Sequence, residues 1–307
     1  MKSRTIQIIA AAVLICAALV LFFWDSITLV LFPREEVVKP TPEPTAVATA
    51  TPKPTPTPTP TVEPTPTPTP RPTQDPKWDE LLERNPDTVG WLNVPNTEVD
   101  YAIVQGEDDI FYLDHNFDKK SDYQGWLFMG IDAKLLDDDK NIVIHGHNMK
   151  NGTQFGTLKK YDVTRSESSA LKFYKENPTF TFETLYEAEK TYKIISVMLI
   201  DASADPLFYY PYNDFESDES FLSFVDQLKI RSMINIDNVD VQGEDKLVIL
   251  STCTADWQME NGRLVIVGRK VRDGEEETVD TENATVNENV LMPDLWYQLH
   301  GGEKPEF

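Results

Sequence analysis

Short apolar runs alternate with polar, turn-forming stretches from about residue 88 to residue 271, a pattern typical of β-strands. Longer runs with helical spacing predict helices at 76–85, 166–177 and 218–233, the last beginning with an acidic turn. Many short strands with few helices favour a mainly β fold, a closed β-barrel with flanking helices, over a doubly wound sheet. The strands are expected at 88–94, 98–105, 125–130, 141–147, 180–185, 190–200, 246–253 and 263–271.

Residues 1–32 have the pattern of a membrane anchor. Lys2 and Arg4 precede an unbroken apolar run from Ile6 to Trp24, close to the roughly 20 residues that cross a bilayer core. No small-residue cleavage site follows, so we expect an uncleaved transmembrane helix. The positive-inside rule then places the N-terminus in the cytoplasm and everything after Pro33 outside the cell.

Residues 33–76 form a Thr/Pro alternation that contains most of the chain's 22 prolines. Proline excludes helices and sheet ladders, so we expect residues 40–76 to be an extended stalk that reaches about 110 Å when fully stretched. The globular domain is expected at 77–272. Residues 273–307 are acidic and poor in large apolar side chains, which predicts a flexible tail. Its apolar end suggests a short docked helix or a lid over a substrate groove.

Composition narrows the function classes. The net charge of -23 argues against a nucleic-acid partner, because phosphate binding needs clustered Lys and Arg. The chain has 2 cysteines, and Cys16 lies in the predicted anchor. The globular domain therefore holds a lone thiol, Cys253, and cannot form an internal disulfide.

Cys253 ends an apolar strand beside polar residues, where a thiol is either a reactive nucleophile or a small core residue. His145 and His147 end another apolar strand, and histidine is the usual acid or base beside a cysteine nucleophile. The spacing of the two histidines also allows a metal site, although Cys253 alone would have to complete it. Arg263 opens the next strand. If that strand pairs with the Cys253 strand as an antiparallel hairpin, Arg263 lies at the same end and can donate to an oxyanion.

These residues resemble the sortases, the membrane-anchored cysteine transpeptidases of Gram-positive bacteria, and specifically their class B. The resemblance rests on "HGHNMKNGTQFGTL", on "LSTC" and on the ten-residue step from Cys253 to Arg263. It extends over "NPDTVGWLNVPNTEVDYAIVQGEDDIFYLDHNF" and "YPYNDFESDESFLSFVDQLKIRSMIN", and covers roughly residues 78–271. The family signature Thr-Leu-x-Thr-Cys reads here with Ile249 and Leu250 in its first two positions.

The resemblance implies a role for each candidate residue. Cys253 is the nucleophile that attacks the carbonyl after Thr in a C-terminal sorting signal and forms a thioacyl enzyme. His147 is the general acid and base, and Arg263 binds the substrate and supports the oxyanion. The substrate-binding candidates are Ser251, Tyr210, Thr252, Asp109 and His145; His145 takes the family's usual tyrosine position, and Asp109 stands where some class B members carry an asparagine.

The residues themselves call for no metal and no organic cofactor. The resemblance implies two kinds of partner. One is a surface protein that carries a sorting signal, and the other is an amine acceptor, either a peptidoglycan precursor or a pilin. Two alternatives remain open from the residues. One is a cell-wall cysteine peptidase or L,D-transpeptidase, although Thr254 and Ala255 follow Cys253 where the latter family places an arginine. The other is a non-catalytic, stalked binding protein in which Cys253 is incidental.

Overall fold

The computed structural model describes residues 74–135, 139–205, 207, 213, 215–254 and 258–307. The predicted anchor and nearly all of the predicted stalk lie outside these residues. Within the described ranges, no helix is both long and apolar enough to cross a bilayer.

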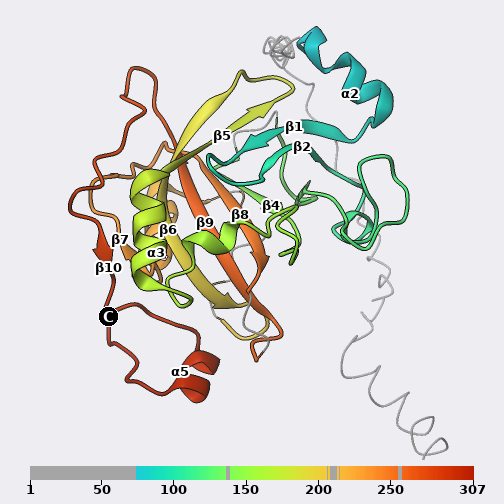
Figure 1. The fold of residues 1–307 in the computed structure, drawn as a ribbon. Helices are drawn as coiled ribbons and strands as arrows, with labels where there is room; N and C mark the ends of the chain where they lie inside the picture. The colour runs from blue at the N-terminus through green and yellow to red at the C-terminus, as the bar shows by residue number, and fades with distance from the viewer. Residues whose placement is uncertain (1–73, 136–138, 206, 208–212, 214, 255–257) are drawn as a thin grey trace, which may run out of the picture. The chain divides into compact units, whose positions relative to one another are not determined.

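Eight strands form a closed barrel in the order β1-β2-β3-β4-β8-β9-β6-β5 (Figure 1). Most neighbours are antiparallel, but β2 pairs with β3 and β4 pairs with β8 in parallel. The predicted mainly β barrel is confirmed, and each predicted strand has a counterpart. The barrel strands are β1 (Thr88–Asn93), β2 (Asp100–Val104), β3 (Phe128–Met129), β4 (Asn141–His145), β5 (Thr179–Thr184), β6 (Lys190–Asp201), β8 (Leu247–Cys253) and β9 (Gly262–Lys270).

The central strands β6, β8 and β9 are covered on both faces. In β8, every residue from Leu247 to Thr252 is buried and only Cys253 is exposed. This explains why its sequence is a continuous apolar run rather than an alternation. The hydroxyl of Ser196 on β6 donates to the Leu228 carbonyl at 2.8 Å and so ties the covering helix α4 (Asp218–Ile230) to the barrel.

The helices lie where the pattern predicted them, with ends shifted by a few residues. α4 starts at a capping box in which Ser217 and Ser220 exchange side-chain and backbone hydrogen bonds. The other α-helices are α2 (Asp79–Arg84), α3 (Glu167–Glu176) and α5 (Asp294–His300), and the short 3-10 helices are η1 (Pro76–Trp78), η2 (Phe111–Leu113) and η3 (Leu158–Tyr161).

The C-terminal segment differs from the expected flexible tail. Its strand β10 (Thr285–Val286) pairs with β7 (Ile234–Asn235), and Ala284 and Met292 are buried. Glu275 binds the buried Arg269 of β9 through two guanidinium nitrogens. The flexible tail was expected because the segment is acidic. However, Glu275 neutralises the buried Arg269, and several of the few apolar residues pack on the domain surface.

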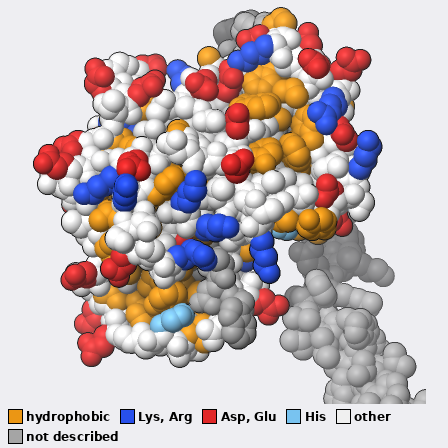
Figure 2. All heavy atoms as spheres, viewed as in Figure 1, with side chains coloured by type: hydrophobic (Ala, Val, Ile, Leu, Met, Phe, Trp, Pro, Cys, Tyr) orange, Lys and Arg blue, Asp and Glu red, His pale blue; other side chains and the backbone are white. Residues whose placement is uncertain are grey.

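On the face shown in Figure 2, Lys and Arg side chains are interspersed with Asp and Glu side chains.

Candidate active site

Strand register brings the candidate residues to one end of the barrel. Cys253 on β8 lies directly opposite Arg263 on β9, as the predicted antiparallel hairpin requires. On the other side of β8, Ser251 is in register with His145 of the parallel strand β4. Cross-strand partners project from the same face with Cβ atoms about 5 Å apart. The thiol and the guanidinium therefore start from neighbouring positions on one face.

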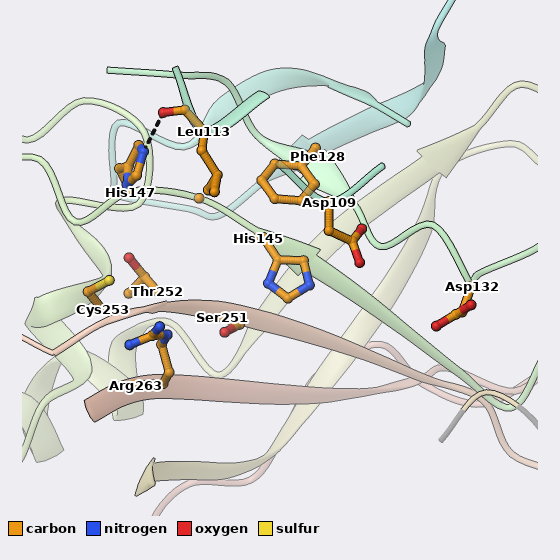
Figure 3. Close-up of a pocket in the computed structure, with 11 residues that line it drawn as sticks. Asp109, Leu113, Phe128, Asp132, His145, His147, Ser251, Thr252, Cys253 and Arg263 are labelled. Atoms are coloured by element: carbon orange, nitrogen blue, oxygen red, sulfur yellow. Dashed lines mark hydrogen bonds between the residues drawn. The ribbon is translucent and has the colours of Figure 1, made fainter. Parts of the chain in front are cut away.

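These side chains line a cavity of about 440 Å³ (Figure 3). Tyr210 lies outside the described residues, and every other candidate named from the sequence lines this cavity. None of residues 273–307 lines it, so the structure gives the idea of a tail lid no support. The lining residues are Asp109, Leu113, Phe128, Asp132, His145, Gly146, His147, Ser251, Thr252, Cys253 and Arg263.

Cys253 combines an exposed side chain with a fixed backbone. Its thiol is free and exposed. The Asn148 side-chain amide donates to the Cys253 carbonyl at 2.9 Å, and the next residue, Thr254, donates its N–H to the Gly262 carbonyl at 3.0 Å. The end of β8 is thus held on two sides while the sulfur stays accessible, as a nucleophile requires.

His147 lies just beyond β4, which ends at His145 rather than at 147 as predicted. Its Nε2 is 2.7 Å from the Leu113 carbonyl oxygen. Because a carbonyl oxygen only accepts, Nε2 carries the proton, which leaves Nδ1 to exchange a proton with a reacting group. Phe155 N–H also donates to the His147 carbonyl at 3.0 Å. Figure 3 shows the imidazole on the same side of the cavity as Cys253.

Arg263 has a largely uncommitted guanidinium. Within the described part of the chain it donates one hydrogen bond, from Nη1 to the Gly262 carbonyl at 3.0 Å, and forms no ion pair with a carboxylate. Figure 3 places it below Cys253, across the opening from His147. Its remaining donors can therefore reach a substrate carbonyl or the oxyanion that forms when sulfur attacks.

His145 is distinguished from His147 by its surroundings. Burial, and to a lesser degree the positive charge of Arg263, lowers the pKa of His145 to about 4. Its ring also stacks on Phe128 with centroids 5.1 Å apart. An imidazole with this pKa stays neutral near pH 7 and accepts a proton only weakly. The geometry therefore supports His147 as the acid and base and His145 as part of the cavity wall.

The remaining candidates form the floor and the far end of the cavity. Ser251 and Thr252 are buried, and the Thr252 hydroxyl has no hydrogen-bond partner among the described atoms. Asp109 is exposed, and its Oδ1 accepts the Ile131 N–H at 2.8 Å. Within the described ranges, no group of three or more His, Cys, Asp and Glu side chains is arranged to hold a metal ion.

Sequence reasoning missed four residues that shape this site. Leu113 contributes through its backbone carbonyl, so its residue type carried no signal. Asn148 belongs to the turn after the histidines, but only the folded chain shows that it reaches the Cys253 carbonyl. Phe128 and Asp132 come from segments far from both motifs, and the pairing of β3 with β4 brings them near.

Comparison with known proteins identifies the family. The family model of the sortase domain matches residues 92–271 of this sequence. Sortase B of Listeria monocytogenes is 33% identical over 192 residues, which is 62% of this chain and 73% of that protein.

Solved structures agree with this match. The Staphylococcus aureus sortase B–substrate complex has a TM-score of 0.56 and 26% identity, covering 65% of this chain and 86% of that one. Clostridium perfringens sortase B has a TM-score of 0.54 and 29% identity, covering 63% and 99% of the two chains. The chain therefore belongs to the sortases, a family of cysteine transpeptidases, and within them to class B.

Proposed function

We propose that this transpeptidase cleaves a C-terminal sorting signal after its Thr and joins the new carboxyl end to an amine of a cell-wall precursor or a pilin subunit. One observation carries the proposal: Cys253, His147 and Arg263 line a single cavity, with Cys253 and Arg263 directly opposite each other on adjacent strands. The substrate complex described for Staphylococcus aureus sortase B supports a sorting-signal-like peptide as the substrate class.

The reaction has two steps. In acylation, His147 takes the proton of the Cys253 thiol, the sulfur attacks the Thr carbonyl, Arg263 stabilises the oxyanion, and His147 gives that proton to the leaving amine as the C–N bond breaks. In transfer, an incoming amine attacks the thioester, the C–S bond breaks, and the amine proton passes through His147 to the Cys253 sulfur. An amide is consumed and an amide is formed, so the reaction needs neither an oxidant nor an external energy source.

The test is a peptide-cleavage assay with the full-length protein and a library of Asn-Pro-x-Thr-like and Ser-Pro-x-Thr-like peptides. We expect mass spectrometry to find a thioacyl adduct on Cys253. Cys253→Ala should abolish the adduct and His147→Ala should abolish cleavage, whereas His145→Ala should have a milder effect because its pKa of about 4 makes it a weak base. Full cleavage by Cys253→Ala would refute the proposal.

We also propose that the chain is anchored by residues 1–32 and that its Thr/Pro stalk carries the catalytic domain outward on the extracellular side. The apolar run after Lys2 and Arg4 supports this orientation. Because the Cys253 thiol is exposed, a membrane-impermeant thiol reagent should label it in intact cells. Labelling of Cys253 only after lysis would place the domain in the cytoplasm instead.

A further inference from the structure

The strand ladder between β4 and β8 stops just before the two reacting side chains. His145 is in register with Ser251, and the Gly146 N–H still donates to the Ser251 carbonyl at 3.2 Å. If the parallel pairing continued, His147 would lie opposite Cys253. Because β4 ends at His145, backbone pairing alone does not fix the distance from His147 to Cys253.

A tight turn follows the ladder and carries His147. Asn148 forms an isolated antiparallel bridge with Gln154 on the far side of this turn. A Cβ atom on Gly156 would lie 2.1 Å from the Met149 carbonyl oxygen, so only glycine allows this close approach. The turn is therefore defined by its own backbone contacts before it meets β8.

Asn148 connects this turn to the end of β8. Its side-chain Nδ2 donates to the Cys253 carbonyl at 2.9 Å, the one hydrogen bond that this side chain makes within the described residues. The amide thus supplies the kind of donor that a backbone N–H supplies between paired strands. Because Asn148 directly follows His147, the bond ties the backbone beside His147 to the backbone of Cys253.

The ring of His147 is restrained separately. Its Nε2 lies 2.7 Å from the Leu113 carbonyl oxygen, which holds the ring against η2 rather than against β8 (Figure 3). Gly125 leaves room for that carbonyl, because a Cβ atom there would lie 2.7 Å from the Leu113 oxygen. The direction of the ring and its separation from the thiol therefore depend on different contacts, the first from η2 and the second from Asn148.

We propose that Asn148 is a positioning residue for the reaction: by holding the Cys253 carbonyl, its amide sets the separation of the Cys253 sulfur and the His147 imidazole. This inference rests on the proposed function, in which these two groups exchange a proton. Such a transfer needs its two heavy atoms within hydrogen-bond reach. A misplacement of about 1 Å can lower a rate about 100-fold. Asn148 bonds to the Cys253 backbone, so it acts through Cys253 rather than on the substrate.

The first test separates rate from substrate binding. Full-length Asn148→Ala is assayed with the peptide that the wild type cleaves best. We expect kcat to fall about tenfold with KM unchanged, because the alignment of the reacting groups is lost while the walls of the cavity remain. Asn238→Ala is the matched control, since the Asn238 amide donates to the Asp280 carbonyl at 2.8 Å and Asn238 does not line the cavity. The control should keep the wild-type kcat.

The second test detects the pairing of His147 and Cys253 without a peptide. Alkylation by iodoacetamide is followed by mass spectrometry of the peptide that contains Cys253, because the chain has a second cysteine, Cys16. Asn148→Ala and His147→Ala should each slow the alkylation, since the thiolate is the species that reacts. In the His147→Ala background, Asn148→Ala should cause no further loss. A purely structural role would slow alkylation equally in both backgrounds.

Asn148→Asp covers the case in which Asn148→Ala fails to fold. An ionised aspartate has nearly the size of asparagine but only accepts hydrogen bonds, so it cannot hold the Cys253 carbonyl. The value of kcat should fall at least as far in this variant as in Asn148→Ala.

The outcomes separate this inference from the proposed function. Absence of any thioacyl adduct in the wild type would refute the proposed function. A normal wild-type adduct combined with a wild-type kcat in Asn148→Ala or Asn148→Asp would refute only the positioning role. A raised KM with unchanged kcat would also refute it, because Asn148 would then bind substrate. Equal slowing of alkylation by Asn148→Ala with and without His147, or an equal fall of kcat in Asn238→Ala, would refute it as well.

Discussion

Strand β9 carries two arginines in opposite situations. Arg263, at its beginning, lines the active-site cavity and, among the described residues, makes a single hydrogen bond, to the Gly262 carbonyl. Arg269, near its end, is fully buried and binds both carboxylate oxygens of Glu275, with 2.7 Å between Nη2 and Oε1. The same residue type thus serves as an available cation at one end of the barrel and as a structural ion pair at the other.

The difference lies in what the neighbouring segments supply. The C-terminal segment brings Glu275 to Arg269, and Lys193 of β6 also binds that carboxylate at 2.7 Å. Hydrogen bonds from Arg269, Lys193 and the Arg272 N–H hold the pKa of Glu275 well below its ordinary value. In the described ranges, no segment brings a carboxylate into a salt bridge with Arg263. A charge left without a protein partner at a cavity is available for substrate, whereas a charge with one is committed to stability.

Removal of the structural arginine should have the largest effect. Arg269→Ala leaves Glu275 without its main partner and is expected to lower the free energy of unfolding by about 3–5 kcal/mol. Urea unfolding checks this. The double variant Arg269→Met/Glu275→Leu should recover only part of the loss, because it removes both charges of the pair but leaves Lys193 without its carboxylate. A double variant as unstable as Arg269→Ala would show that the ion pair is not the cause.

Removal of the available arginine should instead affect the reaction. Arg263→Ala is expected to lower the rate of acyl transfer about 10²–10³-fold, the usual effect of losing one oxyanion donor. Its midpoint of urea unfolding should stay near that of the wild type, because no ion pair within the described residues is broken. If Arg263→Ala were strongly destabilised but still active, Arg263 would be a structural residue like Arg269, and the contrast between the two arginines would be wrong.

The smallest expected effect concerns pH and His145. The pKa of His145 is about 4 in the folded state, below its ordinary 6.5, so the unfolded chain binds more protons between these values. The free energy of unfolding should therefore fall as pH drops from about 6.5 to about 4.

In His145→Tyr, the free energy of unfolding should change less steeply with pH. The slope should be smaller by up to about 1.4 kcal/mol per pH unit, which corresponds to about one proton. Unfolding measured at several pH values in this window checks it. Glu275 also contributes at the acidic end of this window, because its unfolded-state pKa is near 4.5, but its contribution is the same in both proteins and cancels in the comparison. If the free energy of unfolding changed with pH identically in the wild type and in His145→Tyr, burial would not lower the pKa of His145.

Periodicity and motif spacing predicted much of this molecule. The apolar runs predicted the barrel strands and the β8–β9 hairpin, which placed Arg263 opposite Cys253. Family membership, first indicated by the "LSTC" and "HGHNM" motifs, decides against an L,D-transpeptidase and against a non-catalytic stalked module. In residues 273–307 the short helix expected at the apolar end is present as α5, but the expected flexibility differs from the structure, because composition alone cannot show that one glutamate meets a buried arginine.

The sequence by itself determined which elements form and which residue types carry chemistry, because both depend on local spacing and on side-chain identity. Tertiary structure decided which of two neighbouring histidines stays neutral, which of two arginines binds a carboxylate, and that a leucine carbonyl orients His147. These properties depend on burial and on contacts between residues distant in the chain. A one-dimensional pattern does not contain them, because pKa and hydrogen bonding are set by neighbours in space.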